Sequence, residues 1–180
     1  MDPFEILSLP RRPFLDDEEI GSAYRKLAGE LHPDQAGGDA IAFRKLGEAA
    51  AILRDPARRL RELAGTGSGG NLPPHAAELF PPIAEILQRA DTLLEKQSQA
   101  SNALAKALLA SPAKTVMTDL KSILTLIRTW RASLDQELIK IDQGWPEHDS
   151  ATLLLLADSF AYEGRWENQL RERALALDCL

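Results

Sequence analysis

The apolar residues of this chain recur at intervals of three or four positions, which is the period of an α-helix. The longest such run covers residues 116–141 and predicts one helix with a continuous buried face. Its members are Val116, Leu120, Leu124, Ile127, Trp130, Leu134, Leu138 and Ile141. Shorter runs with the same spacing occur on both sides of it, so we predict an all-α protein.

In the first third of the chain, two apolar stripes predict an antiparallel pair of helices. Asp16 is suited to cap the first helix, and that helix ends at His32, because a residue that precedes a proline disfavours the α conformation. The second helix begins near Asp39 or Ala40 and ends at Asp55-Pro56. The stripes are Ile20, Tyr24, Leu27 and Leu31, then Phe43, Leu46, Ala50 and Leu53, and we assign Tyr24, Leu27, Phe43 and Leu46 to the core.

Shorter helices flank this pair. The sequence DPFEILSLP opens the chain with Asp2 as an N-cap and Pro3 at the first helical position. The sequence PARRLREL (56–63) predicts the last helix of this part.

A stretch rich in Gly, Pro, Ser and Asn, TGSGGNLPPH (66–75), follows the last short helix. Such a composition disfavours both helix and strand and is typical of a linker. We therefore predict three regions: an N-terminal domain over residues 1–65, the linker over 66–75, and a helical bundle over 76–180.

The bundle region predicts three helices. Pro81 and Pro82 are expected to start the first helix, whose apolar stripe weakens in the polar stretch KQSQASN (96–102) before Leu104 and Leu108 resume it. Ser111-Pro112 predicts a turn, and GWPEHD (144–149) predicts another break. The last segment is a single helix or a helical hairpin interrupted at Gly164, and residues 156–177 look somewhat like one tetratricopeptide hairpin.

Charge and cysteine content narrow the possible partners and compartments. The net charge of −6 provides no basic field to attract nucleic acid, so we expect no nucleic-acid partner. The one cysteine, Cys179, allows no disulfide within the chain and is natural in a reducing compartment. The first ten residues are acidic and have too little apolar length for a signal peptide, and no apolar run could span a bilayer. We therefore expect a cytoplasmic protein without a membrane partner.

The chain shows no arrangement of residues typical of an enzyme or a metal site. His32, His75 and His148 fall in three different predicted loops or linkers, and no nucleophile motif is present. The glycines of GTGSGG (65–70) follow no strand, so they favour a linker over a phosphate-binding loop. We expect no enzymatic activity, no cofactor and no metal.

One triplet, His32-Pro33-Asp34, stands between the paired helices. The segments DPFEILSLP, AYRKLAGELHPD (23–34) and FRKLGEAAAILRDPARR (43–59) together resemble the J domain of DnaJ-type co-chaperones in order and spacing. The order and length of the whole chain are similar to the HscB type, which assists iron–sulfur cluster assembly and joins a J domain to a three-helix bundle.

This resemblance implies a docking function. A J domain binds the ATPase domain of a DnaK-type chaperone and triggers ATP hydrolysis there. By resemblance, His32, Pro33 and Asp34 would form the docking tip, with Asp34 accepting a hydrogen bond from an arginine of the chaperone, while Arg25 and Lys26 would meet an acidic patch. Arg11, Arg12, Arg44 and Lys45 would widen the positive area.

Several positions depart from the family pattern. Gln35 and Gly21 stand where basic residues are usual, Gly29 lies in mid-helix, and Ala50 replaces an aromatic residue. These departures keep open an alternative in which the J-like fold is a structural adaptor that stimulates no ATPase. A second alternative is that the triplet only stops the helix, with Asp34 capping the loop.

The resemblance to the HscB type also implies a client on the bundle, with the iron–sulfur scaffold protein as the candidate. Ile83, Leu87 and Leu94 are candidates for an exposed client-binding patch, and the alternative is that they pack against the other bundle helices. Trp145 and Trp166 are either partner anchors or core residues. We expect a monomer.

Overall fold

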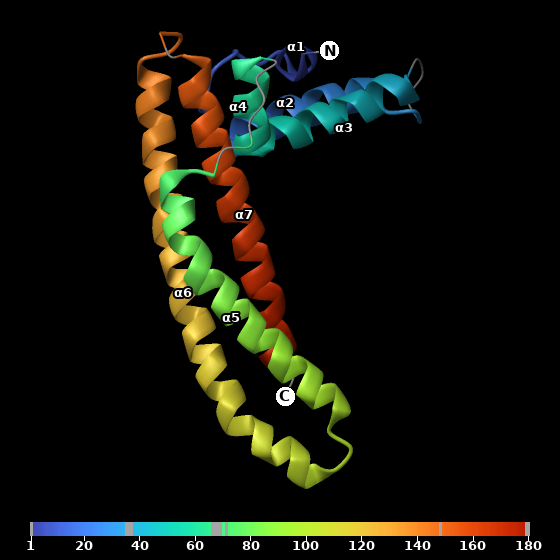
Figure 1. Cartoon of the computed structure of the whole chain (residues 1–180). Coiled ribbons are helices and arrows are strands. Elements are labelled where there is room, and N and C mark those ends of the chain that lie inside the picture. Colours follow the sequence, from blue (N-terminus) through green and yellow to red (C-terminus); the bar gives the residue numbers. More distant parts are fainter. Residues whose placement is uncertain (1, 35–37, 66–69, 71, 148, 179–180) are drawn as a thin grey trace. The chain divides into compact units, whose positions relative to one another are not determined.

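The computed structural model describes the chain apart from residues 1, 35–37, 66–69, 71, 148 and 179–180, so Gln35, His148 and Cys179 lie outside the described residues. Within the described part, every regular element is a helix, which confirms the all-α prediction. The helices are α1 (Pro3–Leu7), α2 (Asp17–Leu31), α3 (Ala40–Arg54), α4 (Pro56–Ala64), α5 (Pro74–Gln99), α6 (Ala103–Gln143) and α7 (Ser150–Asp178) (Figure 1).

The chain divides into two compact units. The first unit comprises Met1–Asn71 and Leu134–Phe160, and the second unit comprises Leu72–Ser133 and Ala161–Leu180. Helices α6 and α7 therefore contribute residues to both. The borders predicted from sequence, at 1–65, 66–75 and 76–180, stay a prediction.

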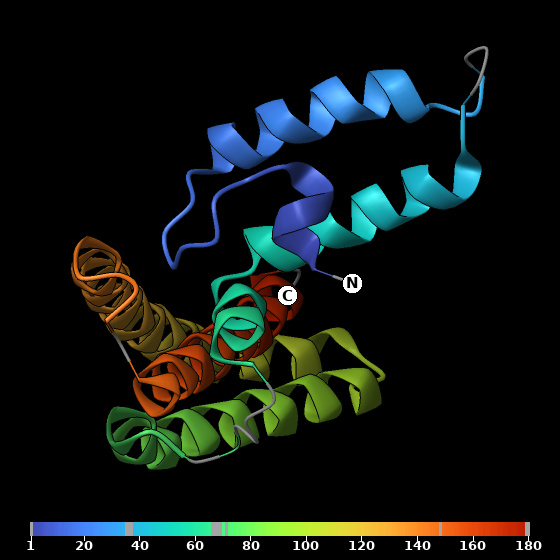
Figure 2. The same cartoon turned by 90° about the horizontal axis from the view of Figure 1, so that it is seen from above.

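Helices α2 and α3 of the first unit run antiparallel and side by side, with α1 across them (Figures 1 and 2). The N-caps expected at Asp2 and Asp16 are present, and Asp39 is the N-cap of α3; each accepts a backbone N–H from the first turn. Tyr24 and Leu27 pack partly buried against the core. The fully buried core residues are Phe4, Leu7, Leu15, Ile20, Leu46, Ala49, Ala50 and Leu53.

The first unit also holds polar contacts between its N-terminal residues and residues 134–160. The backbone N–H of Phe14 donates to the Asp142 carboxylate at 2.9 Å, and the indole N–H of Trp145 donates to the carbonyl of Arg11 at 2.8 Å. Arg61 of α4 donates to Asp158 of α7 at 2.8 Å. Trp145 is thus a hydrogen-bond donor within the unit.

The break predicted at residues 144–149 is confirmed, since α6 ends at Gln143 and α7 begins at Ser150, but the long helices differ from the sequence prediction at their prolines. Helix α5 begins at Pro74, not at Pro81, so the last two residues of the predicted linker are helical. Pro74 fits because the first-turn N–H groups of a helix have no intrahelical partner. Pro81 and Pro82 lie inside α5 on exposed positions, where water can bond the carbonyls that they leave free.

Pro112 and Gly164 also fail to interrupt their helices. The turn predicted at Pro112 is wrong, since the residue lies inside α6, and α7 continues through Gly164, so the tetratricopeptide-like hairpin is wrong as well. A glycine in a helix costs about 1 kcal/mol, which packing can offset. Glu163 and Trp166 beside Gly164 are buried and hold α7 in place.

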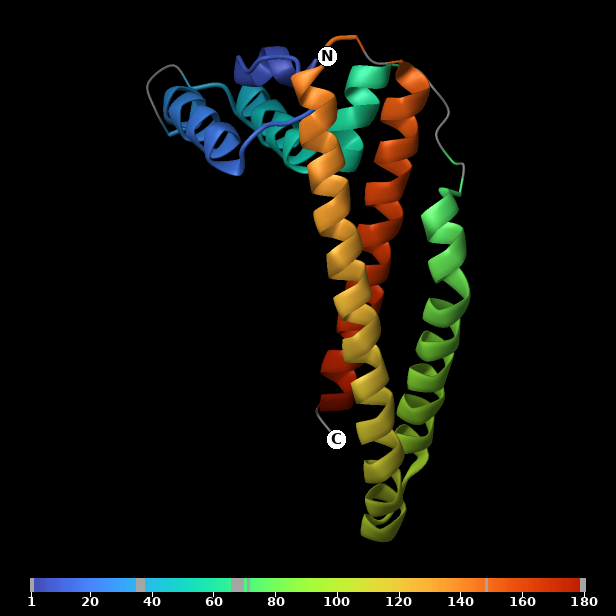
Figure 3. The ribbon, with the colours of Figure 1, turned by 90° about the vertical axis from the view of Figure 1, so that its left-hand side faces the viewer.

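In the second unit, α5 packs with the parts of α6 and α7 that belong to it (Figure 3). All eight stripe residues predicted over 116–141 are buried. The ring of Trp130 lies edge-on to that of His75, with centroids 5.3 Å apart, and tilted to that of Trp166, with centroids 6.1 Å apart. His75 therefore lies in helix α5 and not in a linker, and the buried Trp166 is a core residue. Leu104 and Leu108 are exposed, contrary to the expectation that they resume the stripe.

None of the described helices has an apolar stretch that would cross a bilayer, although α6 alone is 41 residues long.

Candidate functional site

The turn between α2 and α3 presents the His32-Pro33-Asp34 triplet. His32 caps α2 with ψ at 131°, as expected of a residue that precedes a proline. The backbone N–H of Asp39 donates to the carbonyl of Leu31 at 3.2 Å and ties the end of α2 to the start of α3. Two packed helices therefore support the triplet from both sides.

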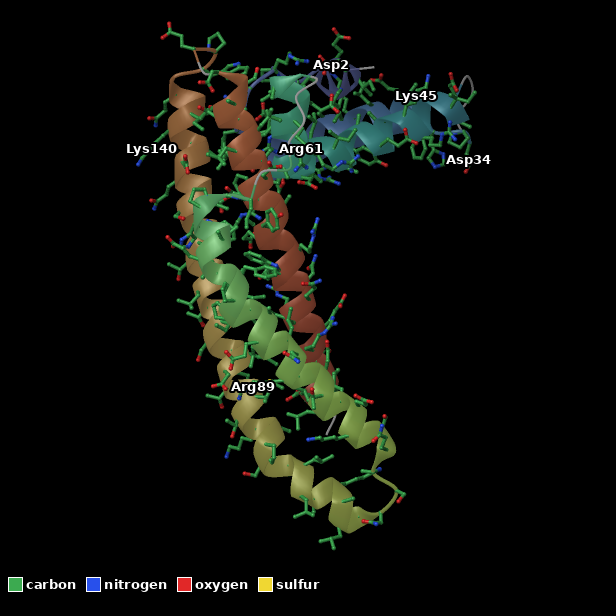
Figure 4. The ribbon with its side chains drawn as sticks, viewed as in Figure 1. Asp2, Asp34, Lys45, Arg61, Arg89 and Lys140 are labelled. Atoms are coloured by element: carbon green, nitrogen blue, oxygen red, sulfur yellow. The ribbon has the colours of Figure 1, made fainter. Side chains whose placement is uncertain are left out.

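Asp34 projects from the far end of the helix pair (Figure 4). Its side chain is 88% exposed, and its carboxylate lies 3.7 Å from Nδ1 of His32. That distance exceeds a hydrogen bond. No hydrogen-bond donor among the described residues reaches this carboxylate. The alternative in which Asp34 caps its own loop stays a prediction, because residues 35–37 lie outside the described part of the chain.

His32 is oriented by two contacts. Its Nδ1 accepts the backbone N–H of Asp34 at 3.3 Å, so a neutral ring carries its proton on Nε2. Its ring meets the edge of Phe43 at 5.3 Å and 78°. Phe43 is half-buried, so the residue that we assigned to the core on sequence grounds also supports the histidine at the tip. Both contacts limit the freedom of the tip before any partner binds.

Gly38 is a residue that sequence reasoning missed. A Cβ atom at this position would lie 2.0 Å from the carbonyl oxygen of His32 and 3.0 Å from Cα of Pro33. Only glycine fits so close to another backbone segment. The pair Gly37-Gly38, which follows the triplet after two intervening residues, is the sequence signal that could have pointed to this contact.

The basic residues of α2 differ in how free they are. Arg25 donates to Glu18 at 2.8 Å, and its guanidinium folds back over Gly21, whose missing side chain leaves room for it. Lys26 is exposed and forms no ion pair with the described residues. Both lie on α2, whose end the triplet follows, within about 11 Å of that end along the helix axis.

The other predicted cations are mostly paired with carboxylates. Arg11 pairs with Asp2, Arg12 pairs with Glu19 at 3.1 Å, and Arg44 lies 3.8 Å from Glu48. Lys45 is half-buried on α3 (Figure 4). Lys26 is therefore the main free positive charge near the triplet. Arg25 would add to it if it left Glu18 for a carboxylate of a partner.

The candidate client residues of α5 are not equivalent. Ile83 is 2% exposed and packs in the second unit, which agrees with the packing alternative for this side chain. Leu87 and Leu94 are half-buried. A client-binding role for these two stays a prediction.

Comparison with known proteins relates the N-terminal part of the chain to a protein family. The family model of the DnaJ domain matches residues 2–61, a third of the chain. The chaperone protein DnaJ of Deinococcus proteolyticus is 42% identical over 76 residues, which cover 41% of this chain and 24% of that protein. The human DnaJ homolog subfamily C member 18 is 47% identical over 60 residues, which cover 32% of this chain and 16% of that protein.

These matches extend over less than a quarter of each relative, so the likeness concerns the domain and not the whole proteins. The solved structure of the chaperone HscB from Vibrio cholerae aligns with a TM-score of 0.54 at 18% identity and covers 96% of both chains. At that identity the alignment shows a shared fold. The chain therefore contains a DnaJ domain at residues 2–61, and 96% of it shares the all-α fold of HscB.

Proposed function

We propose that this chain is a co-chaperone that docks through its J domain on the ATPase domain of a DnaK-type chaperone and stimulates ATP hydrolysis there. The chain performs no chemistry itself. The observation that carries the proposal is the exposed Asp34 carboxylate, without a donor among the described residues, at the end of a rigid helix pair. The J-like structural adaptor, without ATPase stimulation, is the competing function.

The chemistry of docking follows from this geometry. A carboxylate that accepts a hydrogen bond from an arginine contributes on the order of 1.5–3 kcal/mol. The contacts of His32 with Phe43 and with the Asp34 backbone reduce the conformational entropy that docking would otherwise cost. Lys26 and Arg25 would attract an acidic surface and mainly raise the association rate.

A steady-state ATPase assay with the DnaK-type chaperone of the same organism tests the proposal. Wild-type protein should stimulate hydrolysis, and Asp34→Asn should weaken the apparent affinity or the stimulation by about tenfold or more, because the charge-assisted bond is lost. Asp39→Asn is the matched control: it removes the same charge close by, and asparagine caps α3 as well as aspartate does.

No stimulation by the wild type, or equal stimulation by wild type and Asp34→Asn, would contradict the proposal and favour the adaptor. For Lys26→Glu, we expect slower association and a weaker dependence on salt concentration, with little change in maximal stimulation.

We further propose that the bundle carries a client, with the iron–sulfur scaffold protein as the candidate implied by the HscB-type layout. Leu87 and Leu94 of α5 are the contact residues in this proposal, since Ile83 is buried. A pull-down with the purified scaffold protein should retain it on the wild type and lose it on Leu87→Ser/Leu94→Ser. Absence of binding would leave another client and would not affect the ATPase result.

A further inference from the structure

A hollow of about 400 Å³ lies between α6 and α7 within the second unit. Its apolar part consists of Met117, Ala174 and Leu175, and Leu175 is 70% exposed. Three cations line it from two helices, Lys121 and Arg128 of α6 and Arg171 of α7. None of these residues belongs to the J domain or to the candidate client residues of α5.

The cations on α6 follow a regular spacing. Lys114, Lys121 and Arg128 are seven residues apart, which places them on one face of the helix at intervals of about 10.5 Å. All three are exposed, and Lys114 and Lys121 form no ion pair with the described residues. Seven residues are two helical turns, so a helix laid alongside would present its own residues at the same interval.

The acidic groups near the hollow do not balance these cations. Glu167 accepts from Arg171 at 2.6 Å and lies 4.0 Å from Arg128, and Asp178 lines the far end. Among the described residues, two carboxylates thus lie near four cations, counting Lys114, so this part of the surface carries an excess of positive charge although the chain has a net charge of −6. The excess positive charge therefore surrounds the same hollow that exposes Leu175.

We infer that this groove, formed by residues 114–128 of α6 and 171–178 of α7, binds an acidic amphipathic helix of a partner protein. Apolar side chains of that helix would cover Leu175 and Met117, and carboxylates at seven-residue spacing would meet Lys114, Lys121 and Arg128. The inference is independent of the proposed ATPase stimulation.

Other polyanions fit the groove less well. Phosphates of a nucleic acid or of lipid head groups would satisfy the cations but would leave the exposed leucine without an apolar partner. A concave surface between two helices matches the convex side of a third helix better than it matches a flat bilayer.

The test uses the full-length protein and a fluorescent synthetic peptide of about 21 residues, six helical turns, with leucines on one face and flanking glutamates at seven-residue spacing. Fluorescence anisotropy should show saturable binding that weakens with salt, and circular dichroism should show helix formation in the bound peptide. Lys121→Glu/Arg128→Glu should weaken binding on the order of tenfold or more, and Leu175→Ser should weaken it without altering the salt dependence.

The matched control is Lys106→Glu/Lys140→Glu, which makes the same charge change at exposed positions of α6 outside the lining and should bind as the wild type does. Asp34→Asn should also bind normally, which separates this result from the ATPase result. A peptide with lysine in place of glutamate should not bind.

The proposal is overturned if the wild type does not bind the acidic peptide, or if both double variants lose binding equally. It is also overturned if Lys121→Glu/Arg128→Glu instead abolishes binding to phosphatidylserine vesicles or to a single-stranded oligonucleotide. Self-association of the wild type that is lost in this variant, measured by sedimentation, would assign the groove to a second copy of the chain and would overturn it too.

Discussion

Glycine has opposite consequences at two positions beside the docking triplet. Gly38 lies against the backbone, since a Cβ there would be 2.0 Å from the carbonyl oxygen of His32. Gly29 lies in mid-helix, and a Cβ there would meet nothing within 4 Å. The residue type is the same, but only at Gly38 does the fold require the absence of a side chain.

A pair of alanine substitutions tests this difference. Gly38→Ala should destabilise the first unit by about 1–3 kcal/mol, because backbone must shift to admit the methyl group, and it should reduce ATPase stimulation by displacing the triplet. Gly29→Ala should raise the free energy of unfolding by roughly 0.5–1 kcal/mol through helix propensity alone. Urea titration of both variants measures these changes, and equal stability of the two would refute the steric argument.

At the scale of elements, Asp55 ends one helix and starts the next. It is the C-cap of α3, and its carboxylate accepts the N–H of Ala57 at 2.9 Å and of Arg58 at 3.3 Å as the N-cap of α4. Asp55→Ala should therefore lower the free energy of unfolding by about 1 kcal/mol. Asp55→Asn should lower it by only a few tenths, since asparagine caps equally well. Urea unfolding measures both values, and an equal loss of unfolding free energy in the two variants would contradict the prediction.

The elements that could be predicted from sequence are those whose signals are local. Such signals are the caps at Asp2 and Asp16, the two apolar stripes of the N-terminal part and the stripe over 116–141. They predicted α1 to α3 and the buried face of α6 correctly. The prolines at 81 and 112 led to wrong predictions, because a proline penalty of about 3 kcal/mol is set by local rules, while packing along a long helix outweighs it. At Gly164 the single-helix alternative is the correct one.

The candidate site divides in the same way. The triplet and its exposure could be predicted, because a short motif between two stripes determines them. The ion pair of Arg25 with Glu18 could not, because nothing in the sequence alone indicates that Arg25 folds back over Gly21. The groove between α6 and α7 depends on which residues two distant segments bring together, and only the fold supplies that information.

At the scale of the whole molecule, two aspartate–arginine pairs show how burial changes the contribution of an ion pair to stability when the contact distance is the same. Arg61 donates to Asp158 in the first unit and Arg89 donates to Asp119 in the second, both at 2.8 Å (Figure 4). Asp158 is 5% exposed and also accepts the backbone N–H of Gly70 at 2.8 Å, whereas Asp119 is 43% exposed. Asp158 thereby connects α7 to the N-terminal part of the first unit at two points.

Removing each carboxylate should have unequal effects. Asp158→Ala removes a buried carboxylate that accepts from both the Arg61 guanidinium and the Gly70 N–H, and it should cost about 1–3 kcal/mol. Asp119→Ala removes an exposed pair and should cost about 0–1 kcal/mol. Hydrogen exchange of α4 amides, measured in the full chain, should accelerate in Asp158→Ala and remain unchanged in Asp119→Ala. Equal acceleration, or none in either variant, would mean that Asp158 does not hold the N-terminal helices to α7 and that the cohesion of the first unit rests on its apolar contacts.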